Sequence, residues 1–270
     1  MERLTILGTG AAMVTKCYNT CFTLSDETGE SILVDGGGGN GILRQLELAQ
    51  IKIAQIRAAF ITHIHTDHVL GLIWVVRYIC QEINKDRYEG NFCIYGHQRS
   101  LDTIRTICML VLKGKLTVHF DSRILFVPVA DGHRCEILGR KFLFFDICSR
   151  KELQHGFIAT LKNGRRLAFL GDEPMHEENF ETIRGADIVV QEAYCAHADA
   201  EVFNPYAKHH GTALLACQNA QRIGAKMTVL VHTEGRTLDT RRQRYTAEGR
   251  TAFDGEIFVP DDLEIIDLDR

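Results

Sequence analysis

Short apolar runs that end in polar residues recur along the whole chain. Residues with apolar side chains at helical spacing predict helices at 41–50, 70–83, 98–112, 211–223 and 241–249. We predict strands at 4–7, 21–24, 31–34, 58–62, 123–129, 141–145, 157–161, 167–170, 186–190, 227–231 and 263–268. These elements come in two similar halves, which predicts an α/β (α+β) fold of two packed sheets with helices outside, a four-layer αββα sandwich.

The size of the chain suits one such sandwich. It has 270 residues, of which 45% are hydrophobic and 24% are charged, so it can bury a sizeable core. There are only four prolines and no linker rich in Ser, Pro or Gly. We therefore predict a single domain over residues 1–270.

The composition also limits where the protein could be located and which partners it could bind. No apolar run reaches 18 residues and no signal peptide opens the chain, so we expect no membrane span. Nine cysteines without a CxxC pair indicate reduced thiols and a cytoplasmic protein. A formal net charge of -4 gives no general attraction to nucleic acid. Arg241, Arg242 and Arg244 could contact phosphates locally, but a solvated helix face explains them at least as well.

The strongest chemical signal directly follows the predicted strand at 58–62. His63, His65, Asp67 and His68 place three imidazoles and a carboxylate within six positions. Alternation in an extended segment sends His63 and His65 to one side, and the next turn can bring Asp67 and His68 to a second centre. Nitrogen and carboxylate ligands suit zinc, and open mixed sites are usually catalytic. A His-rich polar loop is the weaker alternative.

The first motif leaves a catalytic zinc site short of ligands, because such a site needs three or four. Three other predicted strands carry a ligand-type residue at one end, namely His155, Asp172 and His232. Each alone is more readily explained as a turn former or a cap. Together with the first motif they form a coherent set.

The same residues resemble a known family. Nearly the whole chain is similar to the metallo-β-lactamase superfamily, and more narrowly to its ribonuclease Z branch. Besides 63–68, the matching segments are 7–12, 33–37, 191–194, 210–213 and 231–233. The segment 191–194 is similar to the His-Glu-Ala-Thr loop of that branch, and 210–213 is similar to its His-Ser-Thr loop. This pair is the specific part, because most β-lactamases lack it.

The resemblance implies a site with two zinc ions, although manganese or iron also suits these ligands. One ion would be held by His63, His65, His155 and Asp172, and the other by Asp67, His68, Asp172 and His232. Asp172 would bridge the ions, and Asp35 would support the site from behind. A metal-bridging hydroxide would attack a phosphodiester.

The resemblance also implies roles in proton transfer. Asp67 would orient or deprotonate the nucleophile. His210 would donate to a phosphate oxygen or protonate the leaving alkoxide, and Glu192 would orient His210. A surface histidine that caps the following helix is the alternative for His210.

The chain departs from the branch in one segment. Enzymes of the branch that process tRNA carry a long protruding arm between the ligands matching His155 and Asp172, where this chain has only sixteen residues. A tRNA substrate is therefore doubtful, and we expect a small or single-stranded phosphodiester. A hydrolase of another ester (lactone, thioester or sulfate ester) and a non-catalytic metal-binding sensor remain alternatives.

The resemblance further implies a homodimer formed through helices near the first motif. The predicted helix at 70–83 is apolar enough to provide the interface. Core packing explains the same apolar stripe equally well.

Overall fold

The computed structural model describes residues 1–269. They form two compact units, each built around one seven-stranded sheet. Unit 1 comprises Met1–Gly8, Tyr18–Ala130 and the chain from Asp262 onward, and unit 2 comprises Thr9–Cys17 and Asp131–Asp261. A single domain over residues 1–270 stays a prediction. Among the described residues, no helix combines the length and apolarity needed to cross a membrane.

The sheet of unit 1 is mixed. Its order is β14-β1-β2-β3-β4-β5-β6, with antiparallel pairs from β14 to β3 and parallel pairs from β3 to β6. The strands are β1 (Arg3–Gly8), β2 (Cys21–Ser25), β3 (Ser31–Val34), β4 (Ile56–Ile61), β5 (Phe92–Gly96), β6 (Ile124–Pro128) and β14 (Ile265–Asp267). Parallel neighbours need crossover connections, and here helices provide most of them.

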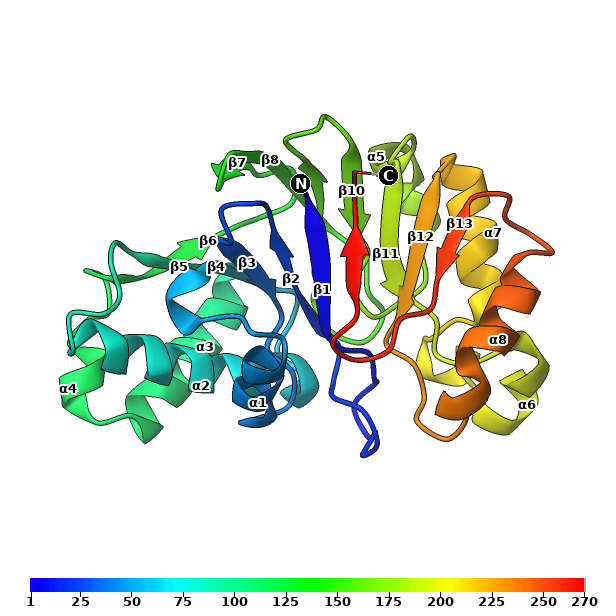
Figure 1. Cartoon of the computed structure of the whole chain (residues 1–270). Helices are drawn as coiled ribbons and strands as arrows, with labels where there is room; N and C mark the ends of the chain where they lie inside the picture. Colours follow the sequence, from blue (N-terminus) through cyan, green and yellow to red (C-terminus); the bar gives the residue numbers. More distant parts are fainter. Residues whose placement is uncertain (270) are drawn as a thin grey trace. The chain divides into compact units, whose positions relative to one another are not determined.

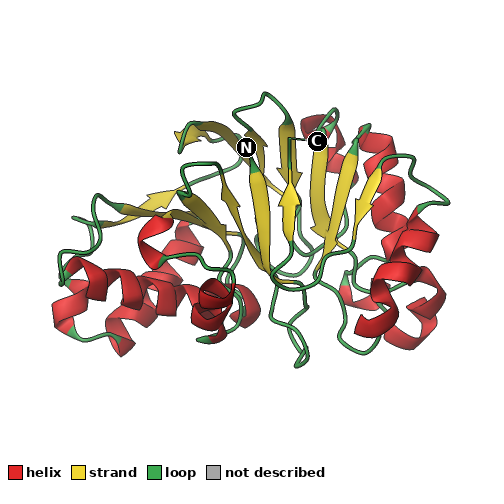
Figure 2. Ribbon diagram, viewed as in Figure 1, coloured by secondary structure: helices red, strands yellow, loops and turns green. Residues whose placement is uncertain are grey.

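Helices cover one face of the sheet of unit 1 (Figures 1 and 2). They are α1 (Gly41–Leu48), the 3-10 turn η1 (Ile53–Gln55), α2 (Thr66–Ile83), α3 (Gln98–Val111) and α4 (Gly114–Thr117). The core between them and the sheet includes Leu72 and Val76 of α2 and Leu33 and Ile61 of the strands, all fully buried. Burying such a side chain stabilises the fold by about 1.5–3 kcal/mol.

The sheet of unit 2 repeats the mixed pattern. Its order is β13-β12-β11-β10-β9-β8-β7, with antiparallel pairs from β7 to β10 and parallel pairs from β10 to β13. The strands are β7 (Arg134–Ile137), β8 (Arg140–Asp146), β9 (His155–Thr160), β10 (Arg166–Phe169), β11 (Ile188–Glu192), β12 (Met227–Val231) and β13 (Glu256–Phe258). The expected repetition of one pattern in two halves is thus present.

The longer helices of unit 2 lie beside its parallel strands (Figure 1). The helical segments are η2 (Glu177–Asn179), α5 (Phe180–Ile183), η3 (His197–Asp199), α6 (Ala200–Phe203), η4 (Tyr206–Lys208), α7 (Ala213–Ile223) and α8 (Leu238–Gly249). The start of α7 is fixed by Thr212, whose side chain accepts a hydrogen bond from the amide of Leu215. Gly224 ends α7 in the left-handed conformation, with φ 81°.

The connection between β9 and β10 is a tight hairpin. Thr160 pairs with Arg166 and Phe157 pairs with Phe169, and Leu161 closes the turn by donating to the carbonyl of Arg165 at 2.9 Å. Sixteen residues thus suffice for two paired strands and a turn, as the sequence predicts, and leave no room for a protruding arm.

Some elements differ from expectation. Helix α2 begins at Thr66, four residues before the predicted start, because His65 takes the extended N-cap conformation. The sequence did not predict the short elements β7, β13 and α4, which have too few residues for a clear apolar period.

A glycine in α2 allows the helix to approach the turn after β3. A Cβ atom on Gly71 would lie 1.7 Å from the carbonyl oxygen of Gly36. Gly71 also donates to the carbonyl of Gly37 at 2.8 Å, and Gly36 donates to the carbonyl of His68 at 2.7 Å. This close approach places the first turn of α2 against the segment that carries Asp35.

We predict that Gly71→Ala lowers the free energy of unfolding by about 2–3 kcal/mol, because the added methyl group overpacks the contact with Gly36. Urea denaturation of the full chain measures the effect. Gly114→Ala is the matched control, since a Cβ atom there meets nothing within 4 Å. Equal denaturation midpoints for both variants would contradict the prediction.

Candidate metal centre

Unit 1 gathers the four residues of the first motif in one turn. They lie between the end of β4 and the first turn of α2, where His63, Asp67 and His68 are buried and His65 is half-buried. Nε2 of His63 lies 2.8 Å from Nδ1 of His65, and the rings of His63 and His68 are 4.2 Å apart between centroids. Nε2 of His68 lies 3.2 Å from a carboxylate oxygen of Asp67. The four side chains therefore lie together, and their role as metal ligands stays a prediction.

Asp35 holds this turn from behind. It follows β3 in the left-handed conformation, with φ 55°, and is buried. Its carboxylate accepts hydrogen bonds from the amide of Thr62 at 2.9 Å, from the Thr62 hydroxyl at 2.9 Å and from Nδ1 of His68 at 2.8 Å. Because Nδ1 of His68 donates a proton to Asp35, Nε2 is the nitrogen that a metal ion would bind after that atom loses its proton.

The Thr62 hydroxyl extends this support to His63. Oγ1 of Thr62 lies 2.9 Å from Nδ1 of His63. Since that hydroxyl donates its hydrogen to Asp35, it accepts from Nδ1 of His63, and Nε2 of His63 also presents a lone pair. Asp35 and Thr62 therefore fix both imidazoles in the same tautomer.

Protonation competes with metal binding at His68. Burial by itself disfavours the charged imidazole, but the carboxylates of Asp35 and Asp67 outweigh burial and hold the pKa of His68 well above its usual range. A metal ion that bound His68 would therefore have to displace a proton from this side chain.

In unit 2, Asp172 lies just after β10, beside one cationic and two polar side chains. Its Oδ2 atom is 3.0 Å from the ammonium group of Lys151 and 3.7 Å from Nε2 of His232. The side-chain amide of Gln154 donates to its other oxygen. The sequence pattern gave no signal for Lys151 or Gln154, because neither stands in a ligand-type motif. His155 begins β9 and is buried, and its role as a ligand stays a prediction.

Glu192, His210 and His232 form a second group in unit 2, with one ligand atom of each within 4.8 Å of the others. Glu192 ends β11 and His232 follows β12, while His210 lies just before α7. Nδ1 of His210 is 3.2 Å from Oε2 of Glu192 and 3.1 Å from the carbonyl oxygen of Asp172. Burial raises the pKa of Glu192 to about 7, although His210 opposes the shift.

Tyr194 fixes the plane of the His210 imidazole. The two rings stack with centroids 4.9 Å apart and planes 10° apart. The ammonium group of Lys208 lies 5.4 Å from the centre of the Tyr194 ring. The sequence analysis assigned no role to Tyr194, although its one signal was visible: a tyrosine stands where the ribonuclease Z loop has threonine.

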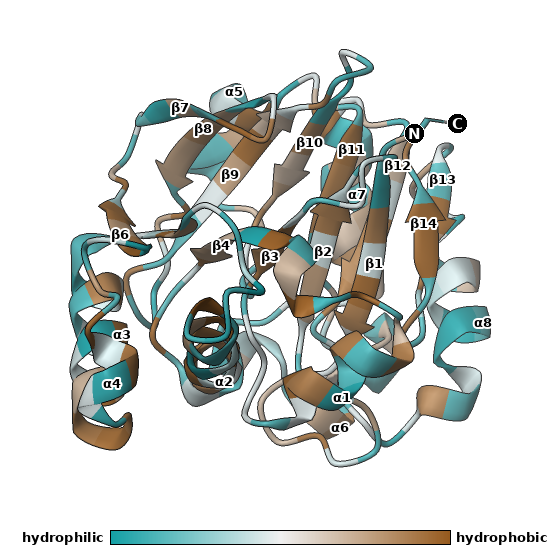
Figure 3. Ribbon diagram, turned by 60° about the vertical axis from the view of Figure 1, so that its left-hand side comes forward, coloured by the Kyte–Doolittle hydropathy of each residue, from teal (hydrophilic) through white to brown (hydrophobic). Residues whose placement is uncertain are grey.

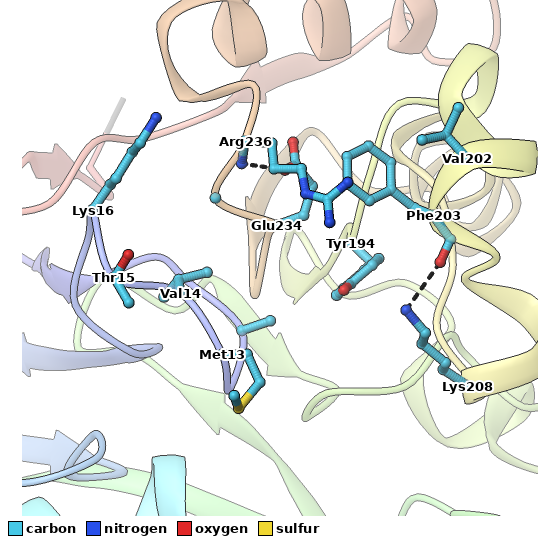
Figure 4. A pocket seen from close by; sticks show the side chains of 12 residues that line it. Met13, Val14, Thr15, Lys16, Tyr194, Val202, Phe203, Lys208, Glu234 and Arg236 are labelled. Carbon is cyan, nitrogen blue, oxygen red and sulfur yellow. Dashed lines mark hydrogen bonds between the residues drawn. The ribbon is translucent and has the colours of Figure 1, made fainter.

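A cavity of about 420 Å³ adjoins Tyr194 in unit 2. Figure 4 shows Phe203, Lys208 and Arg236 around it, together with residues of the segment Thr9–Cys17. The guanidinium of Arg236 lies 5.6 Å from the centre of the Phe203 ring, and Lys208 donates to the Phe203 carbonyl at 3.0 Å. Aromatic and cationic groups therefore line a hollow beside the ring that holds His210.

The donor chemistry of both units fits divalent metal ions. Unit 1 offers imidazole nitrogens of fixed tautomer beside a carboxylate, and unit 2 offers the imidazole of His232 beside the carboxylate of Asp172. Nitrogen and oxygen donors of this kind suit zinc and other first-row metals.

We predict that Asp35→Asn lowers zinc affinity by about 10–100-fold, because the His68 tautomer loses its carboxylate partner. Competition with a chromophoric chelator measures the affinity. Asp121→Asn removes an exposed carboxylate that pairs with Arg105 at 2.7 Å in the same unit and serves as the control. If Asp35→Asn binds zinc as tightly as the unchanged protein, Asp35 does not fix the His68 tautomer for metal binding.

Known proteins similar to the chain include ribonucleases Z. The chain is 27% identical to the ribonuclease Z of Bacillus velezensis, covering 97% of this chain and 98% of that protein. It is 25% identical to the ribonuclease Z of Acaryochloris marina, with 85% of each chain covered. These relatives confirm the predicted class, a metal-dependent hydrolase similar to ribonuclease Z.

Solved structures confirm the predicted fold class. The metallo-β-lactamase fold protein YhfI from Bacillus subtilis matches with a TM-score of 0.78 at 15% identity, over 99% of this chain and all of that one. The short form of human tRNase Z matches with a TM-score of 0.76 at 23% identity, over 98% and 99% of the two chains. A diphosphatase of the PhnP family matches with a TM-score of 0.74 at 18% identity, over 99% and 98%.

A family model described as anti-Pycsar protein Apyc1 matches residues 2–209, most of the length of the chain. Within the metallo-β-lactamase superfamily, the chain therefore belongs to the family of the anti-Pycsar protein Apyc1.

Proposed function

We propose that this protein is a dinuclear metal-dependent phosphodiesterase that acts, with zinc, on a small or single-stranded phosphodiester. The observation that carries the proposal is the pair of the buried Glu192 and the half-buried His210 beside Asp172 and His232. A carboxylic ester needs no such additional proton donor for a phosphate oxygen. The names of the relatives, ribonuclease Z and a diphosphatase, agree with phosphate chemistry.

The ligands in unit 1 would be the four side chains of the turn before α2. The ligands in unit 2 would be Asp172, His155 and His232. When bound, such ions supply positive charge opposite the phosphoryl oxygens and lower the pKa of water. Zinc is the metal that the donor set favours, and manganese or iron would also fit.

The residues of the chain itself would handle the protons. Asp67 is buried beside His68 and would accept the proton of the attacking water. Nδ1 of His210 is held between Glu192 and the carbonyl of Asp172, so Nε2 is the atom that would donate to the phosphate or the leaving alkoxide. The stacked Tyr194 ring would keep that imidazole in place during the reaction.

The substrate would extend into the cavity beside Tyr194. Lys208 and Arg236 supply positive charge there, and Phe203 supplies an apolar wall. The tight β9–β10 hairpin provides no arm to hold a folded RNA. We therefore propose that precursor tRNA is not the natural substrate.

We predict that His63→Ala abolishes hydrolysis of bis(p-nitrophenyl) phosphate, because a ligand is lost. His210→Asn should lower kcat by about 100–10,000-fold, the usual contribution of a positioned general acid, and leave metal content unchanged. His209→Asn is the matched control, since His209 is exposed and its φ of 58° suits asparagine. Steady-state kinetics with metal analysis on each variant provides the measurement.

A matched p-nitrophenyl carboxylic ester distinguishes the alternative class of hydrolase. Turnover of that ester by the metal-loaded parent, with every phosphodiester untouched, would show that the Glu192 and His210 pair serves another reaction. Two equivalents of metal without turnover of either substrate would indicate a binding protein.

We also propose a homodimer formed through α2 and α3 of unit 1. Large apolar side chains of these helices are exposed, among them Trp74 at 39% and Leu110 at 80%. Trp74 lines a cavity of about 400 Å³ together with Leu70 and Val111. Exposed apolar area of this kind is typical of a protein interface.

We predict that the protein sediments with the mass of two chains and that Leu110→Glu shifts it to one chain, because a buried charge at the interface is unpaired. Analytical ultracentrifugation measures both masses. Ile265→Glu, which places the same charge at a residue 58% exposed on β14, should leave the mass unchanged. A parent mass of one chain would exclude the dimer.

A further inference from the structure

Helix α8 contains a buried arginine that the reaction scheme does not use. The helix is mainly hydrophilic (Figure 3), and its neighbouring residues Arg242 and Arg244 are 53% and 33% exposed in their side chains. The side chain of Arg241 is only 2% exposed. Burial excludes both interpretations that the sequence left open for Arg241, a contact with a phosphate and a place on a solvated helix face. A guanidinium is rarely buried unless hydrogen bonds compensate for the lost water.

The guanidinium of Arg241 joins three segments that are far apart in the sequence. Nη1 donates to the hydroxyl of Thr233 at 2.7 Å and to that of Thr9 at 3.2 Å. Nη2 donates to the carbonyl of Pro260 at 2.6 Å and to a carboxylate oxygen of Asp261 at 3.0 Å. A planar guanidinium reaches four acceptors in fixed directions, which an ammonium group cannot do.

One of these segments carries the ligand-type residue His232. This residue leaves β12 in the left-handed conformation, with φ 57°, which a residue other than glycine keeps only when its surroundings hold it there. The next residue, Thr233, donates its amide to the carbonyl of Thr9 at 2.9 Å and accepts from the amide of Ala11 at 2.9 Å. Arg241 therefore fixes both sides of this backbone contact through the hydroxyls of Thr9 and Thr233.

We propose that Arg241 is a positioning residue that holds His232 in the conformation that binds metal. The proposal rests on the proposed function, in which His232 is a ligand. The guanidinium contacts neither metal nor substrate and acts through Thr233, so its loss weakens metal binding without removing a ligand. Every contact on which the argument depends lies within unit 2.

The test compares zinc affinity, measured by chelator competition, in full-length Arg241→Lys and Arg242→Lys. Lysine keeps the charge but cannot reach all four acceptors, so Arg241→Lys should bind zinc about 10–100-fold more weakly, the usual effect of disturbing a residue that orients a ligand. Arg242→Lys should match the parent, because the Arg242 side chain is 53% exposed and lysine can keep the ion pair with Asp261, which is 2.8 Å long. The visible absorption spectrum of Co²⁺ bound in place of zinc should differ from that of the parent in Arg241→Lys and not in Arg242→Lys.

If Arg241→Lys does not fold, Thr233→Val tests the proposal instead, because it removes the same contact from the side of Thr233. It removes the acceptor at 2.7 Å with little change in shape, and it should weaken zinc binding in the same way. In the double variant the loss should be no greater than in the more affected single variant, because both changes break one contact. Additive losses, or parent affinity in folded Arg241→Lys and Thr233→Val, would overturn the proposal.

His232→Ala distinguishes an error in the role proposed for Arg241 from an error in the proposed function. If that variant keeps the parent metal content and affinity, His232 is not a ligand and the function proposed for it is wrong. If it loses metal while Arg241→Lys and Thr233→Val bind as the parent does, only the role of Arg241 is wrong.

Discussion

The buried carboxylate of Asp35 is the constraint on which the ligand-type side chains after β4 depend. It would be costly in a dry interior, and three hydrogen bonds from Thr62 and His68 compensate for its burial. The same bonds decide which nitrogen of each imidazole carries a proton. One buried anion thus determines both the path of the chain after β4 and the chemistry that His63 and His68 can offer.

In unit 2 a buried positive charge has a structural role like that of the Asp35 carboxylate in unit 1. The buried guanidinium of Arg241 lies behind the turn after β12, as the carboxylate of Asp35 lies behind the turn after β4. Asp35 and His232 both adopt the left-handed backbone at the end of a strand. In each unit a buried charged group with several hydrogen-bond partners stabilises a strained backbone conformation just after a strand. The ligand-type side chains lie at these strand ends.

Much of this could be predicted from the sequence because it is local. Apolar runs predict the strands, and a ligand-type residue directly after a run is visible without a structure, as for His63 and His232. Arg241 could not be predicted in the same way. Its helix has the composition of a solvated surface, and its partner Thr9 lies 232 positions away. Likewise, Lys151 and Gln154 gain significance only from their contacts with Asp172.

The ammonium group of Lys151 determines the charge beside Asp172. It lies 3.0 Å from the Asp172 carboxylate, so this buried anion has a resident cation within unit 2. If Asp172 binds a metal ion as proposed, binding would exchange one cation for another, and a monovalent ion would gain little over the ammonium group. An ion with two charges would offer Asp172 a stronger partner, so the exchange would select against sodium and potassium.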